Sequence, residues 1–221
     1  MFQASPAISS VYALGTYSKT VGVYMEKQLL CLLEGQAGGV TQIQFTPDGS
    51  FLLAGGRKDN EILVWDLRNP GELLAVLQRI VQTNQRIQFD VKESMVLSGG
   101  SDGGVLAWDL TSTPREEDKV IPPVLRWRDL HGGDCVNGVT FNPHHNVFAS
   151  SSGQRHFSDP CEQFSPDEDG EEKMDESESS GAKKVDNSVK VWAIIDRGEK
   201  VEEASEITES AVEESLDQVE S

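Results

Sequence analysis

The sequence predicts an all-β fold built from repeated four-stranded sheets, and three observations lead to this prediction. Similar apolar stretches end in an aromatic residue at intervals of 41, 43 and 84 residues, at Tyr24, Trp65, Trp108 and Trp192. The first two intervals fit the roughly 40–45-residue period of one blade of a β-propeller. Apolar and polar residues alternate within the repeat, as in residues 40–45, which is typical of half-buried strands. Turn-forming Gly, Pro and Asp residues separate the stretches.

A hydrogen-bond acceptor also recurs six residues before the aromatic residue. Asp59, Asp102 and Asp186 hold this place in three units, and Ser18 holds it in the first. A carboxylate in the tight turn between two strands can accept hydrogen bonds from backbone N–H groups. We therefore expect the three aspartates to hold turns.

The recurring tryptophans are predicted to be structural rather than ligand-binding. Trp65, Trp108 and Trp192 each end the third strand of a unit. A buried indole supplies a large apolar contact. We expect all three to pack between neighbouring blades.

The strands can be assigned unit by unit. The first unit, residues 10–24, is predicted to hold only its two middle strands. The strands expected in the second unit are residues 40–45, 51–56, 61–67 and 72–78. Those of the third unit are residues 85–91, 95–100, 104–110 and 124–130. Those of the last unit are residues 136–143, 147–153 and 188–194.

This count predicts an incomplete ring, because about three full blades and a partial one do not match the 4–8 blades of closed propellers. We expect the chain to be the C-terminal part of a larger propeller or a truncated gene product. Such a piece would expose blade faces and a sheet edge, which favours aggregation.

Charge divides the chain into regions. Residues 1–157 carry a net charge of −3 and are predicted to form the blades, whereas residues 158–221 carry −15. Residues 158–185, with 10 acidic and 3 basic residues, are predicted to be a disordered acidic insert, because they offer too little apolar surface to fold. Residues 186–195 would supply the last strand. Residues 196–221 form an acidic tail, for which a weak helix and disorder are both open.

Serines in the insert are candidate phosphorylation sites. Ser165 precedes a proline, and Ser177 and Ser179 are flanked by acidic residues. The alternative is that the insert is simply a solvated loop.

Several functional classes find no support. The three cysteines, Cys31, Cys135 and Cys161, suggest no disulfide framework and favour a reducing compartment. The histidines and cysteines lack paired metal-ligand spacing, and no nucleophile–base motif is present. We therefore predict no enzyme activity, no cofactor and no metal. No run approaches the ~20 apolar residues of a membrane span, so no membrane partner is predicted.

The recurring pattern of Gly-Gly, then Asp, then Trp-Asp resembles the repeats of the WD40-repeat family. Two departures stand out. The usual Gly-His pair is replaced by Gly35-Gln36 in one unit and by His131-Gly132 in another, and the last Trp-Asp is Trp192-Ala193. We expect these departures to weaken the polar network that such blades contain.

Basic and amide residues gather in loops that are expected to open on one face of the propeller. Such a cluster can hold phosphates and read unpaired bases. The alternative is that these residues only form solvated turns and bind no ligand. The candidate RNA-binding residues are Arg57, Lys58, Asn84, Gln85, Arg86, Gln154 and Arg155.

The motifs around these residues resemble the telomerase Cajal body protein family of WD40 scaffolds. The residues that carry the resemblance are Arg57–Asp59, Trp65–Arg68, Thr83–Arg86, Asn137–Val139 and Ser152–Arg155. The resemblance implies a non-catalytic nuclear scaffold that binds box H/ACA guide RNAs and telomerase RNA and directs them to Cajal bodies. It also implies association with dyskerin and other telomerase and H/ACA particle proteins, coilin, the survival motor neuron complex and factors at damaged chromatin. The telomere and the cytoplasm are further implied locations.

Two other hypotheses remain open. One is a protein-only WD40 adaptor, such as a ubiquitin-ligase substrate receptor or a signalling scaffold. The other is a truncated product with no independent function.

Overall fold

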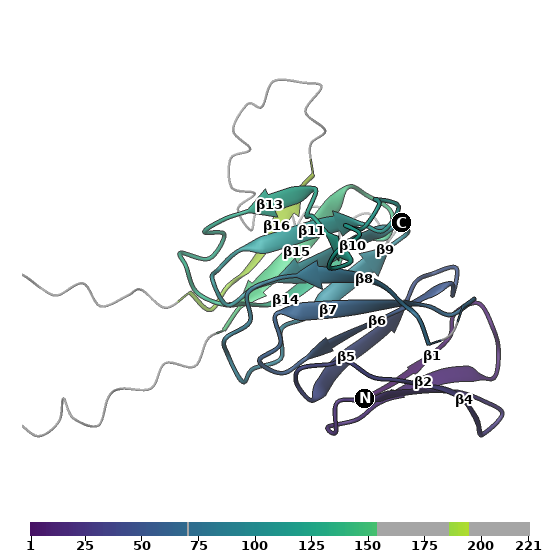
Figure 1. Cartoon of the computed structure of the whole chain (residues 1–221). Helices are drawn as coiled ribbons and strands as arrows, with labels where there is room; N and C mark the ends of the chain where they lie inside the picture. Colours follow the sequence, from purple (N-terminus) through teal and green to yellow (C-terminus); the bar gives the residue numbers. More distant parts are fainter. Residues whose placement is uncertain (70, 154–185, 195–221) are drawn as a thin grey trace, which may run out of the picture.

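The computed structural model describes residues 1–69, 71–153 and 186–194, and all regular structure in these ranges is strand. The prediction of an all-β fold is confirmed. Four separate sheets follow one another in chain order, from the purple N-terminal sheet to the green and yellow last sheet (Figure 1). The sheets do not close into a barrel, as expected for an incomplete propeller.

The first sheet has four antiparallel strands in the order β1-β2-β3-β4. Its strands are β1 (Phe2–Ala4), β2 (Val11–Gly15), β3 (Val21–Met25) and β4 (Gln28–Leu33). The prediction that this unit holds only two strands is therefore wrong. Three residues are too few for β1 to show a recognisable alternation, and β4 exposes three leucines that suggested no strand.

The second sheet contains the four predicted strands and one that was not expected. The four are β5 (Val40–Phe45), β6 (Phe51–Gly56), β7 (Glu61–Asp66) and β8 (Leu73–Gln78). The fifth, β12 (Val120–Ile121), comes from the third unit and pairs in parallel with β8. The link between the second and third units is also fixed by Lys119, whose Nζ donates to the Leu73 carbonyl.

The remaining two sheets follow the predicted strands closely. The third contains β9 (Phe89–Lys92), β10 (Met95–Gly99), β11 (Val105–Asp109) and β13 (Leu125–Trp127). In the described ranges the last sheet has three strands, β14 (Val136–Phe141), β15 (Val147–Ser152) and β16 (Val189–Ala193).

The core lies between the sheets rather than inside any one of them. Trp65 packs among buried residues of the first and second sheets, and Trp108 among residues of the second and third. Trp192 is partly buried against the third and last sheets. Each interface is a layer of apolar side chains from two neighbouring blades, so each blade depends on its neighbour for burial.

Polar contacts also join the inner strands across blades. Asp90 on β9 accepts a hydrogen bond from the Gln44 side chain on β5 at 3.0 Å. Its other oxygen accepts from the Thr140 hydroxyl at 2.9 Å and the Phe141 amide at 2.8 Å, both on β14. One carboxylate therefore connects three consecutive sheets.

Candidate functional site

The turn between β6 and β7 presents two of the predicted basic residues. Arg57 and Lys58 are both exposed, and Lys58 has a positive φ of 49°. Asp59, which follows them, is buried and accepts backbone hydrogen bonds through both carboxylate oxygens. Its Oδ1 accepts from the Glu61 amide at 3.1 Å, and its Oδ2 accepts from the Ala37 amide at 3.1 Å. The carboxylate thus holds its own turn and also binds the loop that precedes β5.

The turns and the interblade loops interlock at this end of the sheets. Asn60, from the β6–β7 turn, accepts a hydrogen bond from the Val81 amide at 2.8 Å through its side chain. Ser101, from the β10–β11 turn, donates its amide to the Ile80 carbonyl at 2.8 Å and accepts from the Gln82 amide at 3.0 Å. Loops and turns of neighbouring blades therefore form one continuous surface. We call this end of the sheets the loop face.

The three predicted residues after β8 lie in the loop that enters β9. Asn84 and Arg86 are exposed, whereas Gln85 is half-buried. The Gln85 Nε2 donates to the Gly153 carbonyl at 3.1 Å, which brings this loop to the end of β15. Gly153 is the residue before Gln154. The loop face therefore extends from the Gln85 loop to Gly153, where the described range 71–153 ends.

Two further aspartates occupy the equivalent turns. Asp102 accepts the Gly104 amide at 3.4 Å, inside its own turn. Asp186 accepts from Lys190 Nζ at 3.0 Å and contacts His131. Hydrogen bonds from Ser188 and Lys190 hold the pKa of the Asp186 carboxyl below its usual range.

Some predicted residues lie outside the described ranges. These are the candidate RNA-binding residues Gln154 and Arg155 and the candidate phosphorylation sites Ser165, Ser177 and Ser179.

Tyr17 is a residue of the loop face that the sequence did not single out. It lies in the β2–β3 turn with 79% of its surface exposed. The Arg57 guanidinium carbon lies 5.9 Å from the ring centre, and a Cβ added at Gly39 would come within 3.0 Å of the ring. Gly39 thus lets the ring lie on the loop that precedes β5. The sequence did contain a signal for Tyr17. It is an aromatic residue in the turn between the second and third strands of its unit, and Arg57 and Lys58 lie in the equivalent turn of the next unit.

Arg79 is a cation near this face that is not available to a ligand. It is buried, and its Nη1 donates to the Ser98 hydroxyl at 2.8 Å and the Ile87 carbonyl at 3.2 Å. Burial lowers the pKa of Arg79 to about 10, and the charge of Asp59 opposes this shift. A side chain at Gly55 would lie 2.9 Å from the Arg79 Nη2. The guanidinium therefore supports the joint between the second and third sheets.

The last sheet contains a complete chain of polar contacts, so the expectation of a weakened network is wrong there. The Trp192 Nε1–H donates to the Ser150 hydroxyl at 2.8 Å. That hydroxyl lies 2.8 Å from the His131 Nε2, and the His131 Nδ1 lies 3.1 Å from Asp186. Ser98 is the third-sheet equivalent of Ser150, and there Arg79 replaces histidine.

Metal and membrane sites can be examined only in the described ranges. Within residues 1–69, 71–153 and 186–194, His, Cys, Asp and Glu form no group of three or more suited to a metal ion. Over the same residues no helix is long and apolar enough to cross a membrane.

The repeated sheets and their interblade cores define a class of protein. The family described as WD domain, G-beta repeat matches residues 27–66, which cover β4 to β7. The chain therefore contains a WD40 repeat, and its sheets form an incomplete β-propeller.

Within this class the chain is similar to telomerase Cajal body protein 1 from several animals. It is 43% identical to the Mus musculus protein over 68% of this chain and 28% of that protein. It is 43% identical to the Homo sapiens protein over 72% of this chain and 29% of that protein. The Drosophila melanogaster homolog is 42% identical over 61% of this chain and 24% of the homolog. The chain thus spans less than a third of the length of these curated relatives.

Proposed function

We propose that this chain is part of a non-catalytic WD40 scaffold that binds unpaired segments of box H/ACA small Cajal body RNAs and telomerase RNA at the loop face. The scaffold would direct these RNAs to Cajal bodies in the nucleus and so support telomere maintenance. Dyskerin and other particle proteins, coilin and the survival motor neuron complex are its proposed partners. The names of the similar proteins favour this assignment.

The observation that carries the proposal is the arrangement of the loop face. Arg57, Lys58 and Arg86 are exposed on loops that hydrogen bonds tie together. Exposed cations on such loops suit phosphate groups, and exposed amides such as Asn84 suit base edges. Tyr17 adds an exposed ring, on which an unpaired base can stack. A rigid surface of this kind favours binding over chemistry.

Neutralising the three cations is expected to weaken RNA binding. The triple variant Arg57→Gln, Lys58→Gln and Arg86→Gln should lower affinity for a box H/ACA guide RNA roughly 10- to 100-fold at moderate salt, because a protein that neutralises fewer phosphates releases fewer counterions. The slope of log affinity against log salt should fall by roughly one for each phosphate that is no longer neutralised. Fluorescence anisotropy across a salt series measures both quantities.

Two exposed cations away from the loop face provide a matched control. Lys27 lies in the β3–β4 turn at the opposite end of the first sheet, and Arg115 lies in the link after β11. Replacing both with glutamine should leave affinity and salt slope close to those of the wild type. If the two sets of variants behave alike, general charge explains the binding and the site assignment fails.

Tyr17 tests stacking separately from charge. Tyr17→Ala should weaken binding of a single-stranded loop by about 1–3 kcal/mol, roughly 5- to 150-fold, because one stacked base is lost. The salt slope should stay unchanged. Tyr17→Phe keeps the ring and should bind like the wild type. Equal losses in both variants would argue for a role of the hydroxyl instead.

Crosslinking and sequencing in cells decides between the RNA scaffold and a protein-only adaptor. The chain should enrich box H/ACA guide RNAs over an unrelated propeller of similar charge. Absence of enrichment would favour the protein-only adaptor. The modest acidity of residues 1–157 is compatible with either function.

A further inference from the structure

A second candidate binding site lies at the opposite end of the sheets from the loop face. Successive turns of an antiparallel sheet alternate between its two ends. The β5–β6 and β9–β10 turns therefore lie away from the loops that carry Arg57 and Arg86. Between these two turns is a hollow of about 500 Å³, which we call the turn pocket. It spans the joint between the second and third sheets.

The walls of the turn pocket are largely apolar. Pro47 and Phe51 come from the second sheet and Leu110 comes from the third. Leu110 is buried and is fixed by its amide, which donates to the Ser94 carbonyl at 2.9 Å. Phe51 is half-buried at the start of β6. The pocket can therefore take an apolar side chain without rearrangement of the strands.

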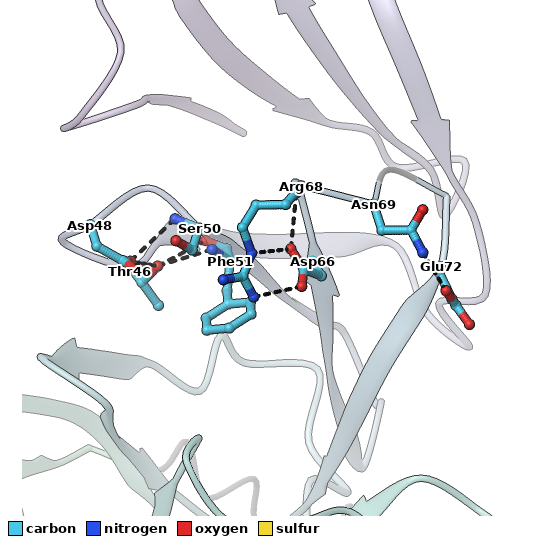
Figure 2. Close-up of polar contacts among 8 residues, drawn as sticks. All are labelled: Thr46, Asp48, Ser50, Phe51, Asp66, Arg68, Asn69 and Glu72. Carbon is cyan, nitrogen blue, oxygen red and sulfur yellow. Dashed lines mark hydrogen bonds and ion pairs between the residues drawn. The ribbon is translucent and has the colours of Figure 1, made fainter.

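The Phe51 ring already contacts one cation. The Arg68 guanidinium carbon lies 5.1 Å from the ring centre. Figure 2 shows Arg68 folded back over the ring while its guanidinium pairs with Asp66, with Nη2 2.7 Å from Oδ2. An aromatic ring in this setting favours a neighbouring positive charge through its electron-rich face.

The rim of the turn pocket is acidic. Asp48 is fixed by its turn, because its Oδ1 accepts from the Ser50 amide at 3.2 Å and from the Thr46 hydroxyl at 2.5 Å (Figure 2). Hydrogen bonds from Ser50 and Thr46 lower the pKa of Asp48. Glu93, exposed at the tip of the β9–β10 turn, adds a second carboxylate.

The cations near this rim are already engaged. Arg68 pairs with Asp66, and Lys92 Nζ donates to the Asn142 carbonyl at 2.9 Å and the His145 carbonyl at 3.0 Å. Three carboxylates, Asp48, Asp66 and Glu93, thus face two cations, Arg68 and Lys92, so the surroundings of the pocket keep a net negative charge. Such a surface repels phosphate groups and attracts basic side chains.

We propose that the turn pocket binds a short peptide segment of a partner protein in which a leucine or phenylalanine lies next to an arginine or lysine. The apolar side chain enters between Pro47, Phe51 and Leu110. The basic side chain lies at the rim beside Asp48 and Glu93. This site is separate from the loop face and does not depend on RNA binding. A scaffold could then hold RNA at one end of its blades and a protein at the other.

A set of labelled hexapeptides with Leu-Arg, Leu-Lys, Phe-Arg or Phe-Lys at the centre tests the proposal with the full chain. Fluorescence anisotropy should show saturable binding by at least one peptide. The same peptide with glutamate in place of the basic residue should bind at least tenfold more weakly. The proposal is overturned if no peptide of the set binds, or if the glutamate version binds equally well.

Filling the turn pocket tests the location. Thr111 is an exposed residue of its wall, and Thr111→Phe should weaken peptide binding at least tenfold by occupying the space. Thr113→Phe changes an exposed threonine two residues away and serves as the matched control. Thermal unfolding shows whether both variants keep the fold. Equal binding by the wild type and a folded Thr111→Phe variant would contradict this location.

The acidic rim can be tested with a second pair. Glu93→Gln should weaken binding two- to fivefold and reduce its salt dependence. Glu26→Gln should have no effect, because Glu26 lies in the β3–β4 turn of the first sheet and does not line the turn pocket. It is a matched control because, like Glu93, it is exposed and has a positive φ. Equal binding by both variants would contradict a role for Glu93, and the charge preference would then have to come from another site.

Discussion

Replacing Trp108 with alanine is expected to destabilise the fold by about 3–5 kcal/mol, since a large buried side chain is removed and a cavity remains. Trp108 has no exposed surface and packs between the second and third sheets, beside Phe89 and Val96. Its indole Nε1 has no hydrogen-bond partner among the described residues. Its contribution is therefore packing alone, and Trp108→Phe should recover much of the stability.

Urea unfolding followed by circular dichroism measures this effect. Trp127 on β13 offers a matched control, because it is only half-buried at the outer edge of its sheet. Trp127→Ala should cost clearly less than Trp108→Ala. Similar costs for the two variants would show that the interblade core does not dominate stability.

Replacing His131 with alanine is expected to destabilise the protein by about 3 kcal/mol, because it removes one buried and one partly buried hydrogen bond and leaves Ser150 without its histidine partner. Trp192 and Asp186 stand at the two ends of the hydrogen-bond network, and they limit the roles of Ser150 and His131 between them. Trp192 can only donate, and the Asp186 carboxylate can only accept. The lowered pKa of His131 favours the neutral ring, in which the Nδ1–H donates to Asp186 and the Nε2 accepts a hydrogen bond from the Ser150 hydroxyl.

The same network predicts a pH dependence with a definite sign. Burial lowers the pKa of His131, although the contact with Asp186 opposes this shift. The unfolded chain binds a proton on this ring near pH 6.5, whereas the folded ring resists protonation. The contribution of His131 to stability should be full above about pH 6.5 and should decline as the pH falls below it.

The free energy of unfolding at pH 7.5 and pH 5.5 tests this sign. The difference between the two values should be smaller in His131→Gln than in the wild type, because glutamine does not titrate. His144→Gln is the control, since His144 is exposed in the β14–β15 turn. An unchanged pH dependence in His131→Gln would show that the ring does not resist protonation.

The repeated markers of the sequence were sufficient to predict the architecture. Aromatic residues at intervals of 41, 43 and 84 residues, each with an Asp or Ser six residues before it, located the third strand of each unit. Alternation located most of the others. The strands that escaped prediction carry no such signal. β1 has three residues, and β4 exposes three leucines, so it shows no alternation. β12 has two residues and pairs with a strand from another unit. Pairing between distant segments is decided by tertiary contacts, which a local pattern does not record.

The candidate site was less predictable than the fold. Turn positions could be inferred for Arg57 and Lys58, but the ring of Tyr17 beside them depends on how the first blade meets the second. The network of His131 was misjudged for a related reason. Its partners Ser150 and Asp186 are far apart in the sequence and meet only when the last sheet forms. The turn pocket likewise exists only at a joint between two blades.

The parallel pairing of β12 with β8 has a consequence for how such chains can change over generations. A repeat is usually treated as a cassette that can be duplicated or deleted without harm to its neighbours. Here the third repeat supplies β12, which is the outermost strand of the second sheet. A gene rearrangement that excised it would remove two residues from the preceding sheet and leave Val76 and Leu77 without partners on the outer edge of β8. The second and third cassettes are therefore expected to be inherited together.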